Sequence, residues 1–269
     1  MRDIWRFIDS ENCSAVYNMA MDEAIAVSVR KEIMPPTLRL YGWNSLAVSI
    51  GCFQKISDID LEYCRRRNIP VVRRPTGGRA LLHGEEVTYS FSVKTISGHF
   101  SKGLLDSFKK ISTALNLALS KIGFSTKIML SKNNRNSLSD KERQRTPLCF
   151  KSISYGEIIL NNKKIIGSAQ KRWTDALLQQ GTIPFVINKK EIIRIFKLEY
   201  IHDLEETLIG LKELFFEVND VEIKYHIRNS FEETFNIQLI SSSPSKEEIE
   251  LAQELEVQKY MSDEWNFRR

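Results

Sequence analysis

The densest group of residues suited to chemistry is the run RRPTGGRALLH at 73–83. Its adjacent glycines, Gly77 and Gly78, follow a strand-like segment, so the backbone there can approach a ligand closely and expose its N–H groups. Three arginines flank the pair: Arg73, Arg74 and Arg79. Guanidinium forks favour phosphate or carboxylate ligands. A plain glycine turn with solvated arginines is the alternative, and the arginine frame favours ligand binding.

Cys149 is a candidate nucleophile. It follows the polar stretch 131–147 and precedes Phe150, so we expect it to be more accessible than a cysteine in an apolar helix. A nucleophilic cysteine needs thiolate character, which a nearby cation can supply. Lys164, at the start of a predicted hairpin strand, is the candidate cation. Spacing alone leaves open a structural cysteine, a solvated lysine, and a purely structural His83.

The other cysteines and the histidines argue against a metal site. Cys13, Cys52 and Cys64 form no CxxC pair with one another or with Cys149, and the four histidines are scattered. The usual zinc spacings are therefore missing, and we predict no metal. In a reducing compartment we expect these three cysteines to be small buried hydrophobic residues.

Composition limits the class of protein. The chain has 269 residues, of which 42% are hydrophobic and 27% charged, so it can bury a sizeable core. Mean hydropathy is −0.29, and charges interrupt every stretch that could approach the roughly 18 apolar residues of a membrane span. The N-terminal residues do not resemble a secretory signal. We therefore expect a cytoplasmic protein that does not interact with membranes.

Charge is distributed unevenly along the chain. Residues 1–198 carry 32 basic and 17 acidic side chains, whereas residues 199–269 carry 7 basic and 17 acidic ones. A basic body suits an anionic ligand or an acidic partner. Nucleic acid is not the expected partner, because the chain has no RNP-type aromatic motif, zinc finger or Lys/Arg-rich tail.

Hydrophobic periodicity predicts a mixture of helices and strands. Helical patterns cover 14–32, 58–68, 107–124, 220–235 and 243–260, and Gly123 should end the third of these. Strand-like runs cover 37–43, 46–50, 70–74, 79–93, 152–160, 164–170 and 177–185. The segment 131–147 is expected to be a long surface loop. Without regular βαβ alternation, these elements predict an α+β fold with a mixed, largely antiparallel sheet flanked by helices.

Two motifs resemble the biotin/lipoate ligase superfamily: RRPTGGRALLHGEEVTYSF at 73–91 and KKIIGSAQKR at 163–172. Three features are similar to its cysteine-dependent octanoyltransferase branch, namely Arg79 after the glycine pair, the run EVTYS at 86–90, and the pair Cys149-Phe150. The segments 18–25, 39–51 and 263–269 also resemble that branch. Gly84 departs from the family, which commonly carries an acidic residue there.

The resemblance implies a ligase-like catalytic domain over residues 1–225, with its motif core at about 30–225, and a C-terminal helical extension over 226–269. It implies that Cys149 takes octanoyl from octanoyl-acyl carrier protein as a thioester. A lysine of a lipoyl domain, such as that of glycine cleavage H protein, then receives the octanoyl group, and no cofactor is needed. Lys164 would lower the pKa of Cys149 and help to position the acyl carbonyl. The resemblance implies these substrate-binding residues: Arg73, Arg74, Thr76, Gly77, Gly78, Arg79, His83, Gly167, Ser168 and Ala169.

Three alternatives remain at this point. An ATP-dependent lipoate–protein ligase would use the same fold, with Lys164 on an acyl-adenylate and Cys149 incidental. An octanoyl amidotransferase would move octanoyl between two lipoyl domains and would share the cysteine. A scaffold that binds lipoyl domains would need no chemistry, and the presence of both Cys149 and Lys164 weighs against it.

Overall fold

The computed structural model describes residues 2–95, 98–100, 103–130, 156–198 and 207–268. The described strands are β1 (Asp3–Cys13), β2 (Thr37–Trp43), β3 (Ala47–Ile50), β4 (Val71–Arg73), β5 (Leu81–His83), β6 (Glu86–Lys94), β7 (Lys127–Ile128), β8 (Ile158–Leu160), β9 (Lys163–Lys164), β10 (Gly167–Arg172), β11 (Ala176–Pro184) and β12 (Ile237–Ser241). The described helices are α1 (Ala15–Arg30), α2 (Leu61–Arg66), α3 (Leu104–Lys121), α5 (Lys189–Ile195), α7 (Asp220–Phe235), α8 (Lys246–Leu255) and α9 (Asp263–Asn266).

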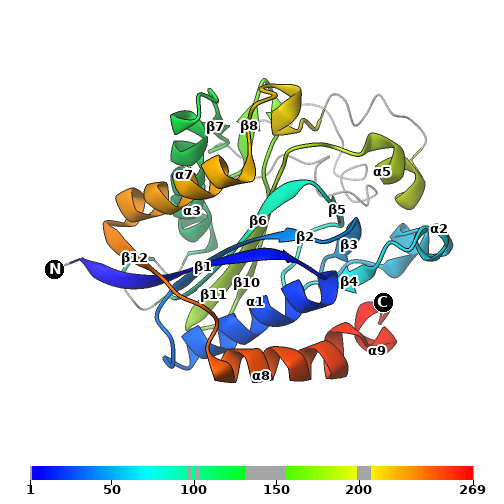
Figure 1. Ribbon diagram of the computed structural model, residues 1–269, viewed down its shortest axis with the longest axis horizontal. Coiled ribbons are helices and arrows are strands. Elements are labelled where there is room, and N and C mark those ends of the chain that lie inside the picture. The colour runs from blue at the N-terminus through cyan, green and yellow to red at the C-terminus, as the bar shows by residue number, and fades with distance from the viewer. Residues whose placement is uncertain (1, 96–97, 101–102, 131–155, 199–206, 269) are drawn as a thin grey trace.

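A six-stranded sheet forms the centre of the molecule, with strand order β10-β11-β6-β2-β1-β12. The pairs β10–β11, β11–β6 and β6–β2 are antiparallel, whereas β2–β1 and β1–β12 are parallel. Helices α1 and α8 cover one face, and α3 and α7 cover the other (Figure 1). The predicted α+β fold with a mixed, largely antiparallel sheet is confirmed.

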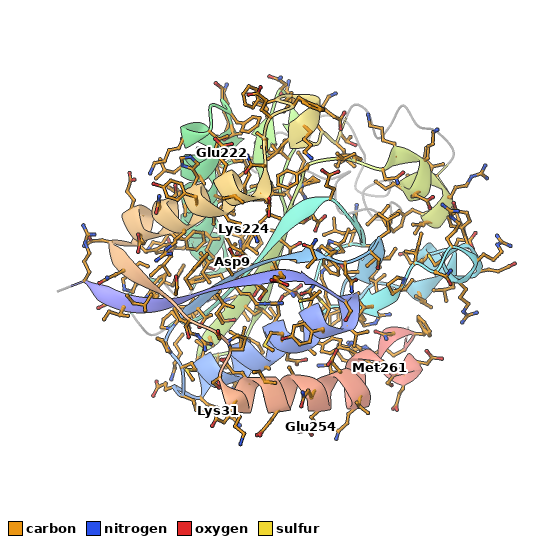
Figure 2. The ribbon with its side chains drawn as sticks, viewed as in Figure 1. Asp9, Lys31, Glu222, Lys224, Glu254 and Met261 are labelled. Carbon is orange, nitrogen blue, oxygen red and sulfur yellow. The ribbon has the colours of Figure 1, made fainter. Side chains whose placement is uncertain are left out.

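Strand β2 shows why the sheet is covered on both faces. All seven of its residues are buried. Leu38 and Leu40 belong to the core beneath α3 and α7, while Tyr41 and Trp43 pack in the core beneath α1. Helix α7 is also joined to the sheet by a polar contact: Lys224 of α7 donates to Asp9 of β1 at 2.7 Å (Figure 2). A strand that is buried on both faces has a nearly continuous apolar sequence, and TLRLYGW fits this pattern except at Thr37 and Arg39.

Local sequence signals mark the beginning of α1 and the end of α3. Ser14 caps α1, since its Oγ accepts from the Tyr17 N–H at 3.1 Å. Helix α3 ends just before Gly123, which has a φ of 101°. Only glycine adopts that backbone conformation at little cost, so the predicted stop is confirmed.

Two predicted strands are each divided in the structure. The run 164–170 is not one strand, because Lys164 ends β9 in a small sheet with β7 and β8, while β10 lies at the edge of the main sheet. The run 79–93 separates into β5 and β6. A two-residue turn joins β8 and β9, and its residues Asn161 and Asn162 both have positive φ, 50° and 62°, which suits a tight hairpin turn.

The C-terminal residues are joined closely to the main sheet. Strand β12 pairs with β1, and α7 runs across residue 225, where the catalytic domain was expected to end. In addition, Arg6 of β1 forms a buried ion pair with Glu248 of α8 at 2.5 Å. The division into residues 1–225 and 226–269 stays a prediction.

A three-stranded sheet, in the order β4-β3-β5, carries the glycine-rich segment between β4 and β5. Strand β3 is parallel to β4 and antiparallel to β5. This sheet lies at the end of the molecule that holds α2 and α5 (Figure 1), and their apolar residues share its core. The small sheet thereby brings the glycine-rich loop against the main sheet.

Candidate active site

A small pocket lies between the two sheets, and we call it the central pocket. Helix α1, both sheets and the segment after β4 contribute to its lining: Met19, Tyr41, Trp43, Ser49, Arg74, Leu81, His83, Thr88, Gly167, Ser168, Ala169, Gln180, Gly181 and Thr182. Most of its exposed wall is apolar. Such a pocket, with a few polar groups among apolar walls, is typical of a small-molecule site.

The central pocket brings together five of the ten predicted substrate-binding residues. Arg74 and His83 come from the first motif, and Gly167, Ser168 and Ala169 come from β10 in the second. The glycine-rich loop lies beside these residues: a Cβ atom on Gly78 would be 3.4 Å from the Ala169 Cβ. Two motifs some 90 residues apart in the sequence therefore meet at one place. A role for these residues in substrate binding stays a prediction.

The glycine loop itself is shaped by close contact with β3. Gly78 has a φ of 82°. Its carbonyl oxygen lies 1.8 Å from the position that a Cβ atom on Gly51 would occupy. Gly77 faces open space. Thr76 is buried and donates to the Gln180 Oε1 at 2.8 Å. Glycine is thus required at positions 51 and 78 for this loop to reach the main sheet.

Arg73 and Arg74 bond to the protein's own backbone. Arg73 is fully buried, and its guanidinium donates to the carbonyl oxygens of Gly51 at 2.8 Å and Asn266 at 3.1 Å. Arg74 donates to the carbonyl oxygens of Gly77 at 2.7 Å and Arg79 at 2.6 Å, which holds the loop closed on itself. The side chain of Arg79 is half-buried. The two buried arginines therefore shape the loop, and direct contact with substrate stays a prediction for all three.

His83 is held by a chain of buried hydrogen bonds. Its Nε2 lies 2.7 Å from the Ser49 Oγ, and its Nδ1 lies 2.7 Å from the Glu86 Oε1. The ring stacks on Trp43, with centroids 3.9 Å apart and an interplanar angle of 13°. Arg74 also donates to the Ser49 Oγ at 3.1 Å, so the serine connects Arg74 with His83.

Glu86 is ionised at neutral pH. Burial raises the pKa of this carboxyl, but the electrostatic attraction and hydrogen bond of His83 and the hydroxyl of Thr88 outweigh burial and lower the pKa below its ordinary value. The Thr88 Oγ1 donates to the same carboxylate oxygen at 2.6 Å. A buried negative charge is thus kept directly behind His83.

A second polar network supports the central pocket from the α1 side. Asp22 and Arg39 are fully buried and form an ion pair at 2.7 Å. Asp22 also accepts from the Tyr41 hydroxyl at 2.8 Å and from the Gln180 Nε2 at 2.7 Å. Gln180 in turn accepts from Thr76. The sequence segments 18–25, 39–51 and 73–91 therefore meet in one buried network that fixes the pocket floor.

Ser168 takes part in a smaller group. Its Oγ lies 2.7 Å from the Tyr89 hydroxyl, to which the Gln179 Nε2 also donates at 2.8 Å. Burial raises the pKa of Tyr89 to about 12, because the charged form would lose its water, and the two hydrogen bonds oppose this only partly. Tyr89 therefore stays protonated at neutral pH.

Lys164 is fully buried and does not line the central pocket. Its Nζ donates to the Glu157 Oε1 at 2.5 Å. The interpretation of Lys164 as a solvated hairpin lysine is therefore wrong. Cys149 and the predicted loop 131–147 lie outside the described residues, so the expected pairing of Cys149 with Lys164 stays a prediction.

The remaining cysteines differ from one another. Cys64 is buried as expected, and burial, with Asp60 nearby, raises its pKa to about 11. Cys13 and Cys52 are only half-buried, contrary to expectation. In the part of the chain that the structure describes, no three histidine, cysteine or acidic side chains are grouped as a metal site would require. No described helix is long and apolar enough to cross a membrane.

Several residues of the site were not identified from the sequence: Met19, Trp43, Ser49, Glu86, Glu157 and Gln180. Glu86 had a usable signal, because it stands three residues after His83 at the start of a strand. The others come from separate elements that only the tertiary fold brings together.

Comparisons with known proteins identify the family of this chain. A sequence model of the lipoyl protein ligase A/B catalytic domain matches residues 14–231. Proteins named octanoyltransferase LipM from Geobacillus kaustophilus and Bacillus subtilis are 34% and 31% identical to this chain over 277 residues, and each alignment covers 100% of this chain and 99% of the relative. 

Solved structures show the same fold. A lipoate-protein ligase A bound with ATP superposes with a TM-score of 0.80 at 22% identity, over 99% of both chains. Ta0514, a putative lipoate protein ligase from T. acidophilum with bound lipoic acid, gives 0.78 at 22% identity over 100% of both chains. By its fold and by the family match over most of its length, this chain belongs to the lipoyl protein ligase A/B catalytic-domain family.

Proposed function

We propose that this protein is an octanoyltransferase that moves octanoyl from a carrier-protein thioester to a lysine of a lipoyl domain. The observation that carries the proposal is the full-length match to relatives named octanoyltransferase LipM at 31–34% identity. The protein is an acyltransferase of lipoate biosynthesis. Octanoyl-acyl carrier protein is the proposed donor, glycine cleavage H protein the proposed acceptor, and the cytoplasm the proposed location.

The central pocket is the proposed site of the octanoyl chain. Met19, Trp43 and Leu81 supply apolar wall, and burying each methylene of an acyl chain is worth about 0.8 kcal/mol. Gly167 and Ala169 have small side chains or none, so the β10 wall takes up little of the pocket. These features support an unbranched acyl group as the ligand.

Cys149 is the proposed nucleophile. Its thiolate attacks the thioester carbonyl of the donor, the carrier thiol leaves, and an octanoyl-enzyme thioester forms. The acceptor lysine amine then attacks this thioester, and the cysteine leaves as the amide forms. Because the octanoyl group arrives already activated as a thioester, neither step needs ATP.

Lys164 is the proposed cation that stabilises the Cys149 thiolate. A nearby positive charge lowers a thiol pKa. The contact with Glu157 gives the buried Lys164 amine a carboxylate partner.

The test is transfer in the absence of ATP. Purified protein, octanoyl-acyl carrier protein and a lipoyl domain are mixed, and the lipoyl domain is weighed by intact mass spectrometry. We expect one octanoyl group on the lipoyl domain without ATP. A modification that appears only with free octanoate, ATP and magnesium would contradict the proposal and indicate a ligase.

A further inference from the structure

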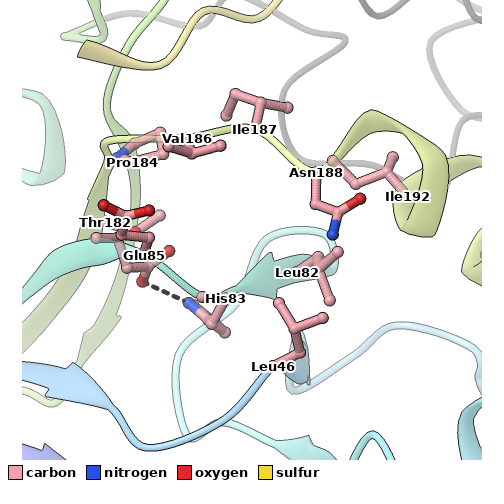
Figure 3. Close-up of a pocket in the computed structure, with 12 residues that line it drawn as sticks. Leu46, Leu82, His83, Glu85, Thr182, Pro184, Val186, Ile187, Asn188 and Ile192 are labelled. Carbon is pink, nitrogen blue, oxygen red and sulfur yellow. Dashed lines mark hydrogen bonds and ion pairs between the residues drawn. The ribbon is translucent and has the colours of Figure 1, made fainter. Parts of the chain in front are cut away.

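A second pocket lies beside the central pocket, and we call it the side pocket. Its wall is largely aliphatic and comes from Leu46, Leu82, Pro184, Val186, Ile187 and Ile192. Figure 3 shows these side chains around an open centre. His83 and Thr182 line both pockets, so the side pocket shares a wall with the proposed acyl site.

The carboxylates of the side pocket already have partners. Glu86 is buried and pairs with His83. Glu85 forms an ion pair with Lys212. The wall also includes Asn188, whose Oδ1 caps α5 by accepting from a backbone N–H at 3.2 Å, which leaves its amide N–H groups to face a ligand. A neutral chain that carries amide groups suits such a pocket better than a charged side chain does.

The side pocket opens to the surface beside the first turn of α5. Val186 lines the pocket with 47% of its surface exposed, and Asn188 is exposed as well. Ile192 of α5 lines the pocket (Figure 3). Lys190 and Arg194, two residues before and after it, are exposed and lie on the opposite side of the helix. The helix therefore forms the pocket wall with one face and carries positive charge on the other.

Helix α2 extends this positive charge. It packs on α5, where Arg67 pairs with Glu191 at 3.2 Å and the Asp60 N–H donates to the Ile195 carbonyl at 2.8 Å. Residues 60–67 and 189–197 hold seven basic and three acidic side chains. Asp60 caps α2, and the other two acids, Glu62 and Glu191, each pair with an arginine. We call the exposed basic side chains of these segments the basic face: Arg65, Arg66, Arg67, Lys190, Arg194 and Lys197.

The chemistry of the two substrates decides which of them this surface suits. A carrier protein holds its thioester on a phosphopantetheine arm, which contains two amide groups and ends in a phosphodiester at the carrier. The amide part is neutral and fits the side pocket, while the phosphodiester is an anion, for which guanidinium and ammonium groups are good partners. The acceptor presents a lysine ammonium, which the same positive charges would repel.

We propose that the basic face of α2 and α5 is the docking surface of the donor carrier protein, with the arm entering the side pocket past the first turn of α5. The proposal rests on the proposed octanoyltransferase function. The phosphodiester then lies outside the pocket, near the basic face. The thioester end of the arm lies next to the central pocket, because the two pockets share a wall.

The test compares two double charge reversals. Lys190→Glu/Arg194→Glu changes the basic face. Lys109→Glu/Lys246→Glu is the matched control, because both lysines are exposed, on α3 and α8, and the change in net charge is the same. Loading of each protein by octanoyl-acyl carrier protein and by octanoyl-pantetheine, which has neither carrier nor phosphate, is followed by intact mass. Transfer from the octanoyl-enzyme to the lipoyl domain is measured separately.

Lys190→Glu/Arg194→Glu should raise KM for the carrier donor about tenfold, the low end of the range over which steering by charge changes association rates. Loading from octanoyl-pantetheine and transfer to the lipoyl domain should stay within about twofold of wild type, because neither substrate contacts the basic face. Added salt should slow carrier loading of the wild type and have less effect on this variant, since salt screens exposed charges.

An equal rise of KM in the control would attribute the effect to net charge and overturn the docking surface. An unchanged KM for the carrier donor, or an equal loss with octanoyl-pantetheine, would overturn it too. Slower transfer to the lipoyl domain alone would assign the basic face to the acceptor, and the proposal would be wrong. A wild type that forms no octanoyl-enzyme from either donor would instead overturn the proposed function on which the docking surface rests.

Discussion

Removing the charge of Asp22 should destabilise the protein more than any surface change. Its carboxylate is fully buried and accepts four hydrogen bonds of 2.7–2.8 Å, from Arg39, Tyr41, Ser90 and Gln180. Asp22→Asn keeps the shape but leaves Arg39 buried without its counter-charge. The amide nitrogen would also face groups that are themselves donors.

The magnitude follows from the burial of the pair. Breaking a buried ion pair by removing one partner costs about 3–5 kcal/mol, because the remaining charge stays desolvated. Against a total stability of about 5–15 kcal/mol, this is a large fraction. For a chain of this size, 1 kcal/mol lowers the melting temperature by roughly 2–4 °C, so we expect a decrease of roughly 6–20 °C.

The assay is urea unfolding followed by circular dichroism, with melting temperature as a second measure. Asp175→Asn is the matched control, because Asp175 pairs with Arg30 at 2.9 Å on the surface and should leave stability close to the wild-type value. The double variant Asp22→Asn/Arg39→Met, which removes the orphaned cation as well, should recover part of the loss. If Asp22→Asn loses no more stability than Asp175→Asn, the buried network does not support the pocket as argued.

Three further outcomes are expected. Burial raises the pKa of Glu23, but the charge of the neighbouring Lys259 and hydrogen bonds from Lys259 and Tyr260 outweigh it, so the net pKa is lowered. The stability that results is present above the ordinary carboxyl pKa of about 4.3 and is lost as pH falls through the lower pKa of the folded state. The free energy of unfolding, measured between pH 5 and pH 3, should therefore depend less on pH in Glu23→Gln than in the wild type. Asn266→Ala removes hydrogen bonds of 2.8 Å from the Arg73 N–H and to the Tyr260 carbonyl, and thermal unfolding should show a loss of about 1–3 kcal/mol. Lys164→Ala should raise the apparent pKa of the proposed nucleophile, Cys149. Iodoacetamide should then alkylate Cys149 more slowly at neutral pH, and the rate should recover at higher pH. If the pH dependence of alkylation is unchanged, Lys164 only positions the acyl group.

Some elements could be predicted because local sequence determines them. The helices α1 and α3 have strong caps or stops in Ser14 and Gly123. The break between β9 and β10 could not be predicted, since Ile165 and Ile166 are both buried and continue the apolar pattern through the bend. Strand β12 was missed because its five residues lie between two helices and pair with β1, more than 200 residues earlier.

The candidate site was predictable only in part for the same reason. The sequence motifs identified some of the residues that line the central pocket, namely Arg74, His83 and the β10 segment. Their partners are set by tertiary structure. Ser49 lies 34 residues from His83, and Gln180 lies 104 residues from Thr76, so no local pattern links them.

The central claim is covalent transfer through Cys149, and intact-protein mass spectrometry tests it most directly. Wild type, Cys149→Ala and Cys52→Ala are each mixed with octanoyl-acyl carrier protein in the absence of ATP. Cys52 is the matched control, because it is a half-buried cysteine beside the glycine loop. We expect one hydroxylamine-labile octanoyl group on the wild type and on Cys52→Ala, and none on Cys149→Ala. An adduct that persists on Cys149→Ala, or octanoyl transfer by that variant at the wild-type rate, would contradict the account.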